Sequence, residues 1–168
     1  MIGQLSLPEI ENLLHNQVIA RIGCHANGHT YIVPVTYAYD GATIFGYSPE
    51  GLKLTMMREN PKVCVEVDHV DDPANWRSVI AHGIFEELSG AAAEEAVRKI
   101  RTRFVPQRGG ATAALSYGLD PHARSLGRVR FSAYRITLEA KTGRFERSDP
   151  VEMSKLRVQF NPLVEGTP

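Results

Sequence analysis

The stretch that decides the fold is residues 30–68, which read TYIVPVTYAYDGATIFGYSPEGLKLTMMRENPKVCVEVD. Its first two parts, residues 30–39 and 43–48, are rich in β-branched and aromatic residues, which favour strands. Between them stands Asp40-Gly41, a dipeptide typical of a tight hairpin turn. The pattern therefore predicts two antiparallel strands joined by that turn.

A short helix and a further strand follow the hairpin. Residues 52–59 have helical composition, and the helix is expected to end at Asn60, because a residue that precedes a proline disfavours helical dihedral angles. Residues 63–68, which read VCVEVD, are rich in valine and predict a strand. The whole stretch thus predicts a hairpin, a helix and a strand in succession.

Polar residues cluster where the second strand meets the helix. Tyr47 and Ser48 end the strand, and Lys53 lies in the first helical turn. A phosphate needs hydroxyl donors, a cation and free backbone N–H groups, and the start of a helix supplies the last of these, with Gly51 allowing close approach. The junction is therefore a candidate anion site. In the alternative interpretation, Ser48 only ends a strand and Lys53 is a solvated helix residue.

Composition places the chain among globular proteins. It has 168 residues, of which 43% are hydrophobic and 23% charged, and its formal net charge is zero. This balance does not favour a general role on nucleic acids or membrane surfaces. The two cysteines cannot build a disulfide scaffold, and no apolar run reaches the length of a membrane span. The expected location is the cytoplasm.

The remaining sequence adds strands and two helices around the central unit. Most connections between strands are too short for helical crossovers, so the strands are expected to form an antiparallel sheet, curled into a small barrel with flanking helices. Gly83 interrupts a long β run and predicts a bulge or close backbone approach. The other expected elements are helices over residues 6–16 and 91–104, strands over 18–23, 76–88 and 128–139, turns at 26–28 and 142–144, and either a loop or a loose helical segment over 106–121.

Three other groups of residues carry reactive or charged side chains. Cys24, His25 and His29 lack the paired spacing of structural zinc sites, so a polar turn is favoured over a metal site. No serine lies in a motif that pairs a nucleophile with a base, which argues against hydrolase chemistry. Residues 98–108 include five Arg or Lys, and a solvated helix face is favoured there over a nucleic-acid patch.

The sequence resembles the pyridoxamine 5′-phosphate oxidase-like FMN-binding split-barrel proteins, and among them the small nitroimidazole-resistance-type members. The resemblance covers about three-quarters of the chain, and its motifs come in the expected order. They are RIG at 21–23, YIVPVTYAYDG at 31–41, IFGYSPEGLKLTMMRENPKVCVEVD at 44–68, NWRSVIAHGIFEEL at 75–88 and YRITLEAKTGRFE at 134–146.

This resemblance implies a mainly β fold, a six-stranded antiparallel split β-barrel over residues 1–147 with a C-terminal tail over 148–168. It implies a homodimer with FMN in a groove between the subunits and a small-molecule substrate. Lys53, seven residues before the Asn-Pro, matches the family's phosphate ligand. The other positions that would lie along FMN are Gly46, Tyr47 and Ser48 on one strand, Val33, Pro34 and Thr36 on another, and Ser78.

Two departures from the family pattern bear on the chemistry. Nitroimidazole-resistance members commonly carry a histidine just before the serine, where this chain has Tyr47. The basic residue beside the phosphate-binding lysine of the true oxidases is replaced by Leu52, and their long C-terminal substrate-binding extension is not evident. Oxidation of pyridoxamine phosphate is therefore not expected.

The resulting hypothesis is an FMN-dependent oxidoreductase that acts on a small aromatic or nitro-aromatic substrate, with no side chain assigned as a catalytic acid or base. The first alternative is a module that binds flavin, deazaflavin or haem without turnover, with His29, His69 and His82 as the axial-ligand candidates for haem. The second is a nucleic-acid-associated dimer that uses residues 98–108.

Overall fold

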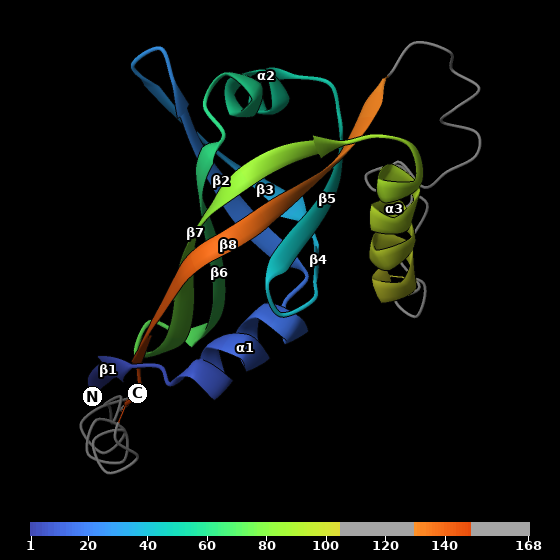
Figure 1. Cartoon of the computed structure of the whole chain (residues 1–168). Helices are drawn as coiled ribbons and strands as arrows, with labels where there is room; N and C mark the ends of the chain where they lie inside the picture. Colours follow the sequence, from blue (N-terminus) through green and yellow to red (C-terminus); the bar gives the residue numbers. More distant parts are fainter. Residues whose placement is uncertain (105–129, 149–168) are drawn as a thin grey trace, which may run out of the picture.

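The structure is a computed structural model that describes residues 1–104 and 130–148. Its strands are β1 Ile2–Gln4, β2 Ile19–Ala26, β3 His29–Thr36, β4 Ala38–Tyr39, β5 Thr43–Pro49, β6 Lys62–Asp72, β7 Asn75–Leu88 and β8 Phe131–Glu146. Its helices are α1 Leu7–Asn16, α2 Leu52–Glu59 and α3 Gly90–Phe104. The strands form one curled antiparallel sheet in the order β3-β2-β6-β7-β8-β5-β4, with β1 paired to β8 (Figure 1).

The sheet closes through residues 30–39, which the sequence predicts as one strand and the structure divides into β3 and β4. Among the described strands, β3 pairs only with β2 and β4 only with β5, so the two ends of the strand order are consecutive in the chain. The break falls at Tyr37, which is fully buried and donates a hydrogen bond to the carbonyl oxygen of Leu14 at 2.7 Å. Residues 30–39 thus contribute to two separate strand pairings, β3 with β2 and β4 with β5. The prediction of one continuous strand over these residues is therefore wrong.

Two further expectations need correction. The described residues form eight strands rather than six, because the two-residue β4 is separate from β3 and because β1 adds a short strand beside β8. The turn expected at residues 142–144 is wrong, since β8 runs through them and pairs them with β7. Gly143 instead lets the side chain of Leu5 approach, because a Cβ there would lie 2.8 Å from Leu5.

Several local predictions are confirmed. α1 begins where expected, with Ser6 as its N-cap residue and with the Ser6 N–H and hydroxyl both donating to Glu9 Oε2, and α2 has the expected bounds. Asn27 and Gly28 join β2 to β3 with φ of 50° and 77°, the left-handed pair that a tight hairpin requires. The ladder between β7 and β8 shifts register at His82 and Gly83, as the bulge prediction requires. The loop or loose helical segment expected over 106–121 lies outside the described residues.

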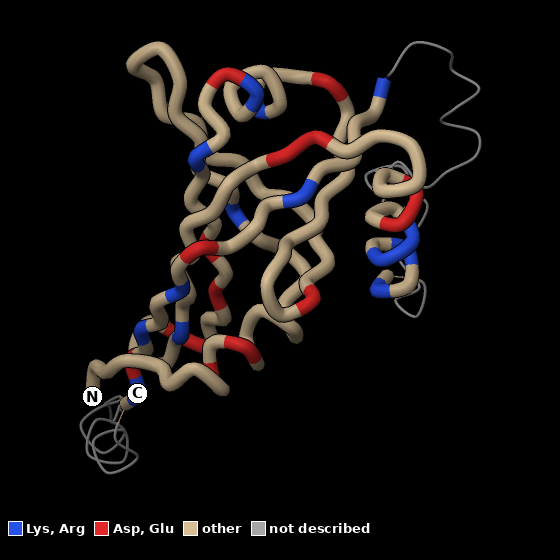
Figure 2. Tube along the Cα trace, viewed as in Figure 1, with Lys and Arg blue, Asp and Glu red and all other residues tan. Residues whose placement is uncertain are grey.

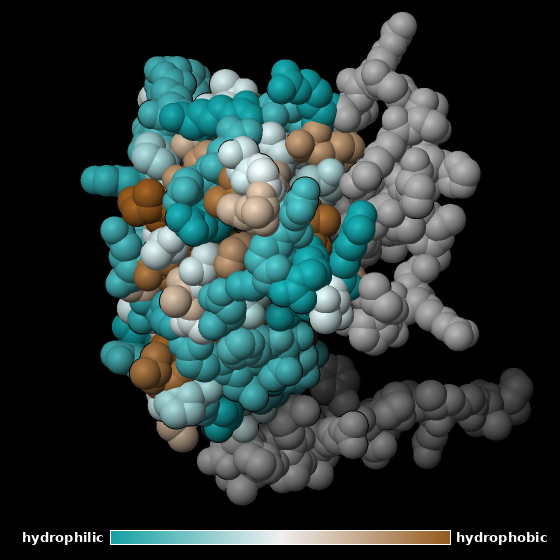
Figure 3. Space-filling view, turned by 45° about the vertical axis from the view of Figure 1, so that its right-hand side comes forward, coloured by the Kyte–Doolittle hydropathy of each residue, from teal (hydrophilic) through white to brown (hydrophobic). Residues whose placement is uncertain are grey.

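The three helices cover different parts of the barrel. In Figure 1, α2 lies across one end of the sheet, α1 lies across the other end, and α3 packs against β5 and β8 from outside. The apolar stripe of α3 consists of Ala96, Ile100 and Phe104, which are buried, with Ala93 and Val97 partly buried beside them. The face shown in Figure 3 is mostly hydrophilic, with apolar residues as separate spots, because most apolar side chains are packed inside.

Candidate functional site

The junction of β5 and α2 has the features of an anion site. β5 ends at Pro49 and α2 begins at Leu52, and no side chain of the described residues caps the helix N-terminus. Gly51, the N-cap residue, has no atom within 4 Å of the place where a Cβ would stand. The first N–H groups of a helix have no partner inside the helix and carry partial positive charge. A ligand can therefore reach these donors directly.

Lys53 adds a full positive charge to the first turn of α2. Its side chain is partly buried, and burial lowers the pKa of its ammonium group below the usual range. It forms no ion pair with any described residue; its neighbours are the ring of Tyr134, whose centroid is 5.9 Å from Nζ, and the thiol of Cys24. Burial likewise raises the pKa of the Cys24 thiol. An ammonium group without a carboxylate partner is suited to an anionic ligand.

The structure brings Ser48 and Lys53 to one side of the sheet and places Tyr47 on the other. Ser48 is buried, and its hydroxyl donates to the carbonyl oxygen of Pro49 at 3.0 Å. Tyr47 faces α3 and stacks on Phe131, with ring centroids 5.1 Å apart and an interplanar angle of 15°. Successive side chains of a strand alternate between faces. The expected convergence of all three side chains on one anion is therefore not observed.

Two backbone segments predicted to contact a cofactor lie at free strand edges. β3, which carries Val33, Pro34 and Thr36, is the last strand of the order and pairs only with β2. β4 pairs with β5 only as far as Phe45, so the facing edge of Gly46 has no ladder partner among the described residues. β3 and β5 approach each other without sharing a ladder. Backbone N–H and C=O groups on both sides of this split are available to a ligand.

Ser78 lies on a different part of the barrel. It is on the outer face of β7, and its hydroxyl donates to Glu66 Oε1 at 3.0 Å, while Arg21 donates to Glu66 Oε2 at 2.9 Å and to Asp68 at 2.8 Å. Arg21 in turn stands opposite Pro34 in the β2–β3 ladder. Ser78 is therefore joined to the β3 side of the molecule through a polar network, and the fold does not bring it to Lys53.

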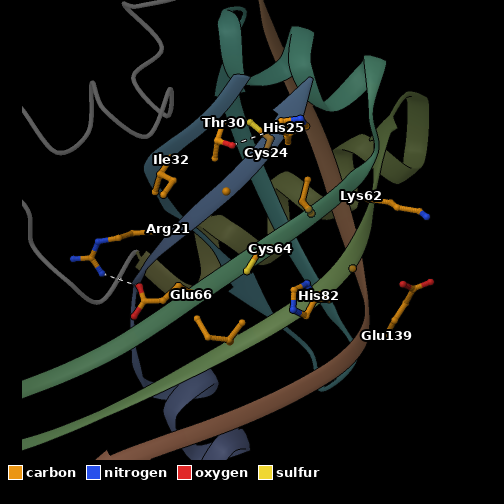
Figure 4. Close-up of a pocket in the computed structure, with 14 residues that line it drawn as sticks. Arg21, Cys24, His25, Thr30, Ile32, Lys62, Cys64, Glu66, His82 and Glu139 are labelled. Carbon is orange, nitrogen blue, oxygen red and sulfur yellow. Dashed lines mark hydrogen bonds and ion pairs between the residues drawn. The ribbon is translucent and has the colours of Figure 1, made fainter. Parts of the chain in front are cut away.

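A groove of about 790 Å³ lies along the outer face of β2, β6 and β7 (Figure 4). Its floor contains Gly23, Ile32, Cys64 and Ile80, and charged or polar side chains stand around it. In Figure 4, the Cys64 and His82 side chains point into the groove from neighbouring strands. The sequence analysis missed this groove, although alternation along residues 62–66 and 80–82 already places these side chains on one face.

The residues considered as metal ligands do not come together. Cys24 is buried and its thiol donates to the carbonyl oxygen of Tyr31 at 3.6 Å, whereas His25 is exposed and hydrogen-bonds Thr30. His29 contacts the carbonyl oxygen of Asn27. In the described part of the chain, no group of three or more His, Cys, Asp and Glu side chains could hold a metal ion.

The basic residues of α3 mostly have structural partners. Arg98 binds Glu95, Lys99 binds Asp40, and Arg103 donates to the carbonyl oxygens of His15 and Gln17 at the end of α1. Figure 2 shows that α3 carries acidic as well as basic positions. These contacts favour the interpretation of α3 as a packed helix with cross-links to its surroundings. Residues 105–108 of the basic segment lie outside the described residues.

An antiparallel barrel that is split between β3 and β5 is the architecture of the split-barrel proteins, and the candidate anion site lies beside the split. The family model described as pyridoxamine 5′-phosphate oxidase matches residues 6–145. The chain belongs to this family.

Individual relatives agree with this assignment. A FAD-binding protein of Mesorhizobium loti is 27% identical, with a TM-score of 0.65 over 86% of this chain and 98% of that chain. A candidate 5-nitroimidazole antibiotic resistance protein of Bacteroides thetaiotaomicron is 16% identical, with a TM-score of 0.64 over 86% and 87%, and shows the shared fold. An uncharacterized protein of Rhizobium meliloti is 33% identical over 84 residues, which span 50% of this chain and 56% of that protein.

The described residues contain no helix long and apolar enough to cross a membrane.

Proposed function

We propose that this protein binds a flavin, specifically FMN, and uses it as an oxidoreductase on a small aromatic or nitro-aromatic substrate. The observation that carries the proposal is the uncapped N-terminus of α2 with Lys53 in its first turn. Backbone N–H groups and one cation without a carboxylate partner form the donor set that a phosphate monoester requires. The FAD-binding protein of Mesorhizobium loti supports a flavin as the ligand.

The residues present fit FMN in two respects. Ser48 and Lys53 face the same side of β5 and could hold the phosphate, with the N–H groups of α2 completing its coordination. The free edges of β3 and β5 offer backbone donors and acceptors to the polar rim of a flavin ring. FMN supplies two-electron transfer when it is bound, and the protein supplies binding and orientation.

Tyr47 has a separate role in the proposal. Its ring faces α3 and stacks on Phe131, so it lies at the border of a second cavity of about 490 Å³. On this face, opposite to Ser48 and Lys53, the role proposed for Tyr47 is to pack β5 against α3 rather than to contact the flavin. No side chain is assigned as a general acid or base.

The proposal includes a homodimer, because within one chain Ser78 lies away from the other residues that are predicted to contact the flavin. Ser78 is separated from the split by the positions of β2 and β6 in the sheet. The outer groove exposes Ile32, which is 65% accessible, on its β3 side, with Arg21 and Glu66 on that side and Lys62 and Glu139 across the groove (Figure 4). A surface with an apolar centre and charges of both signs can be self-complementary about a two-fold axis. A second copy on this face would bring its own Ser78 toward the first copy's split.

The test is reconstitution of the purified full chain with FMN, FAD, a deazaflavin or haem, followed by gel filtration and an absorption spectrum. The proposal expects flavin bands that remain with the protein, strongest with FMN, and anaerobic consumption of a reduced nicotinamide when a nitro-aromatic compound is added. A Soret band would support the haem-binding alternative. Retention of flavin without turnover of any acceptor would support a binding or sensing module and contradict the oxidoreductase proposal.

A further inference from the structure

Tyr134 joins the strand beside the split to the lysine of the anion site. It lies on β8, is 1% exposed, and pairs with Gly46 in the β5–β8 ladder. Its ring fills the space that a side chain at position 46 would need, because a Cβ there would lie 2.1 Å from the ring carbon Cζ. Phe85 packs on the ring with centroids 5.6 Å apart. The position of the Tyr134 ring is therefore fixed by packing.

The Lys53 ammonium lies over this fixed ring. The distance from Nζ to the ring centroid is 5.9 Å, which is within the range of a cation–π interaction. Burial alone disfavours the charged form of Lys53, and no described carboxylate offsets that effect. The negative face of the ring favours the charged form and limits the positions that the flexible lysine side chain can take.

The Tyr134 hydroxyl makes no hydrogen bond to any described residue, and burial raises the pKa of this phenol. The aromatic face therefore accounts for its contact with Lys53, and phenylalanine should replace tyrosine there without losing that contact. Leucine has a similar apolar character but no π system, so it removes the interaction.

We propose that Tyr134 is a positioning residue, which holds the Lys53 ammonium in the first turn of α2 and so makes the site prefer phosphorylated flavins to riboflavin. The inference rests on the proposed function, because it assumes that Lys53 contacts the flavin phosphate. Gly46 is part of the same arrangement, since it leaves room for the ring.

The binding test compares FMN with riboflavin, which lacks the phosphate. Wild type, Tyr134→Phe and Tyr134→Leu are titrated with both ligands. The proposal expects Tyr134→Leu to weaken FMN binding about two- to fivefold, while riboflavin binding stays unchanged and Tyr134→Phe resembles wild type. Equal losses for FMN and riboflavin would indicate a merely structural role and would overturn the proposal. So would a loss in Tyr134→Phe as large as that in Tyr134→Leu.

A double-mutant comparison tests whether Tyr134 acts through Lys53. If it does, Tyr134→Leu has no further effect on FMN affinity once Lys53 is alanine. Full additivity of the two losses contradicts the proposal. If Lys53→Ala binds FMN as tightly as wild type, the phosphate assignment of the proposed function fails, and the proposed selectivity fails with it.

A measurement on the flavin-free protein distinguishes failure of the Tyr134 positioning role from failure of the proposed flavin-binding function. The ring current of Tyr134 should shift the Lys53 side-chain proton signals upfield in the NMR spectrum of the ligand-free protein, in wild type and Tyr134→Phe but not in Tyr134→Leu. Absence of the shift in wild type overturns the positioning role while leaving flavin binding open. Presence of the shift in a protein that ignores FMN shows that the contact exists and that the proposed function is wrong.

Discussion

Gly83 on β7 lies directly against the carbonyl oxygen of Thr137 on β8: a Cβ at position 83 would be 2.5 Å from that oxygen. The close approach coincides with the register shift between His82 and Gly83. Bulges bend a strand and change the direction of neighbouring side chains. The residue that this bulge leaves unpaired is Glu139 on β8, whereas β7 keeps its register with β6, so the His82 side chain points into the outer groove by ordinary strand alternation (Figure 4).

Replacing Gly83 with alanine should destabilise the barrel, because backbone of β8 has to move. The expected loss in the free energy of unfolding is about 1–3 kcal/mol. Urea unfolding monitored by circular dichroism measures it. Gly51→Ala is the matched control, since a Cβ there meets no atom within 4 Å. Equal stability of the Gly83→Ala variant and wild type would show that Gly83 does not lie this close to the carbonyl oxygen of Thr137.

Replacing Ile32 with glutamate should disrupt the proposed homodimer. The side chain lines the outer groove from β3 and is 65% exposed in the single chain, and a buried charge without a partner opposes association. Light scattering after gel filtration should show a shift from twice the chain mass to the chain mass, together with weaker FMN binding. Leu7→Glu changes an equally exposed residue on α1 and should leave the dimer intact. A dimeric Ile32→Glu protein would place the interface elsewhere.

Replacing Glu50 with glutamine should lower thermal stability at neutral pH and have no effect in strong acid. Hydrogen bonds from Arg58 and Ser132 lower the pKa of Glu50 from 4.5 to about 2, and Arg58 also binds Glu87 at the end of β7. A carboxyl group with a depressed pKa stabilises the fold fully above its unfolded pKa, and this contribution is lost as the pH falls through the folded pKa.

The melting-temperature difference between wild type and Glu50→Gln should therefore be constant above about pH 4.5 and shrink to zero near pH 2. Calorimetry over this range provides the measurement. A difference that persists unchanged at pH 2 would mean that the carboxylate charge does not stabilise the junction of β5, α2 and β7.

Local signals in the sequence predicted much of this fold. The positions of α1 and α2, the Asn27-Gly28 turn and the close backbone approach at Gly83 all depend on a few neighbouring residues, and all are observed. The division at Tyr37 and the passage of β8 through Gly143 depend on contacts with distant residues, Leu14 and Leu5. Spacing along the chain carries no record of such contacts, so both were predicted incorrectly.

The candidate site likewise has some features that the local sequence predicts and others that depend on contacts between distant residues. Lys53 and Ser48 could be placed at one junction because they are close in sequence. The opposite direction of Tyr47 follows from strand alternation alone, because Tyr47 and Ser48 are consecutive residues of one predicted strand, so the sequence already argued against their convergence. The Tyr134 ring over Lys53, and the network that links Ser78 to Arg21 through Glu66, join residues from distant parts of the chain. Only the folded arrangement of β2, β6, β7, β8 and α2 reveals them.

The most direct test of the central claim is the dissociation constant of FMN for wild type and Lys53→Ala, with Arg98→Ala as control. Arg98 is a cation of an exposed pair on α3, far along the chain from the proposed phosphate site, so its removal should not matter. We predict that Lys53→Ala weakens FMN binding at least tenfold, a loss of about 1.4 kcal/mol or more, while both variants remain folded. Equal FMN affinity in wild type and Lys53→Ala, or no FMN binding by wild type, would contradict the account.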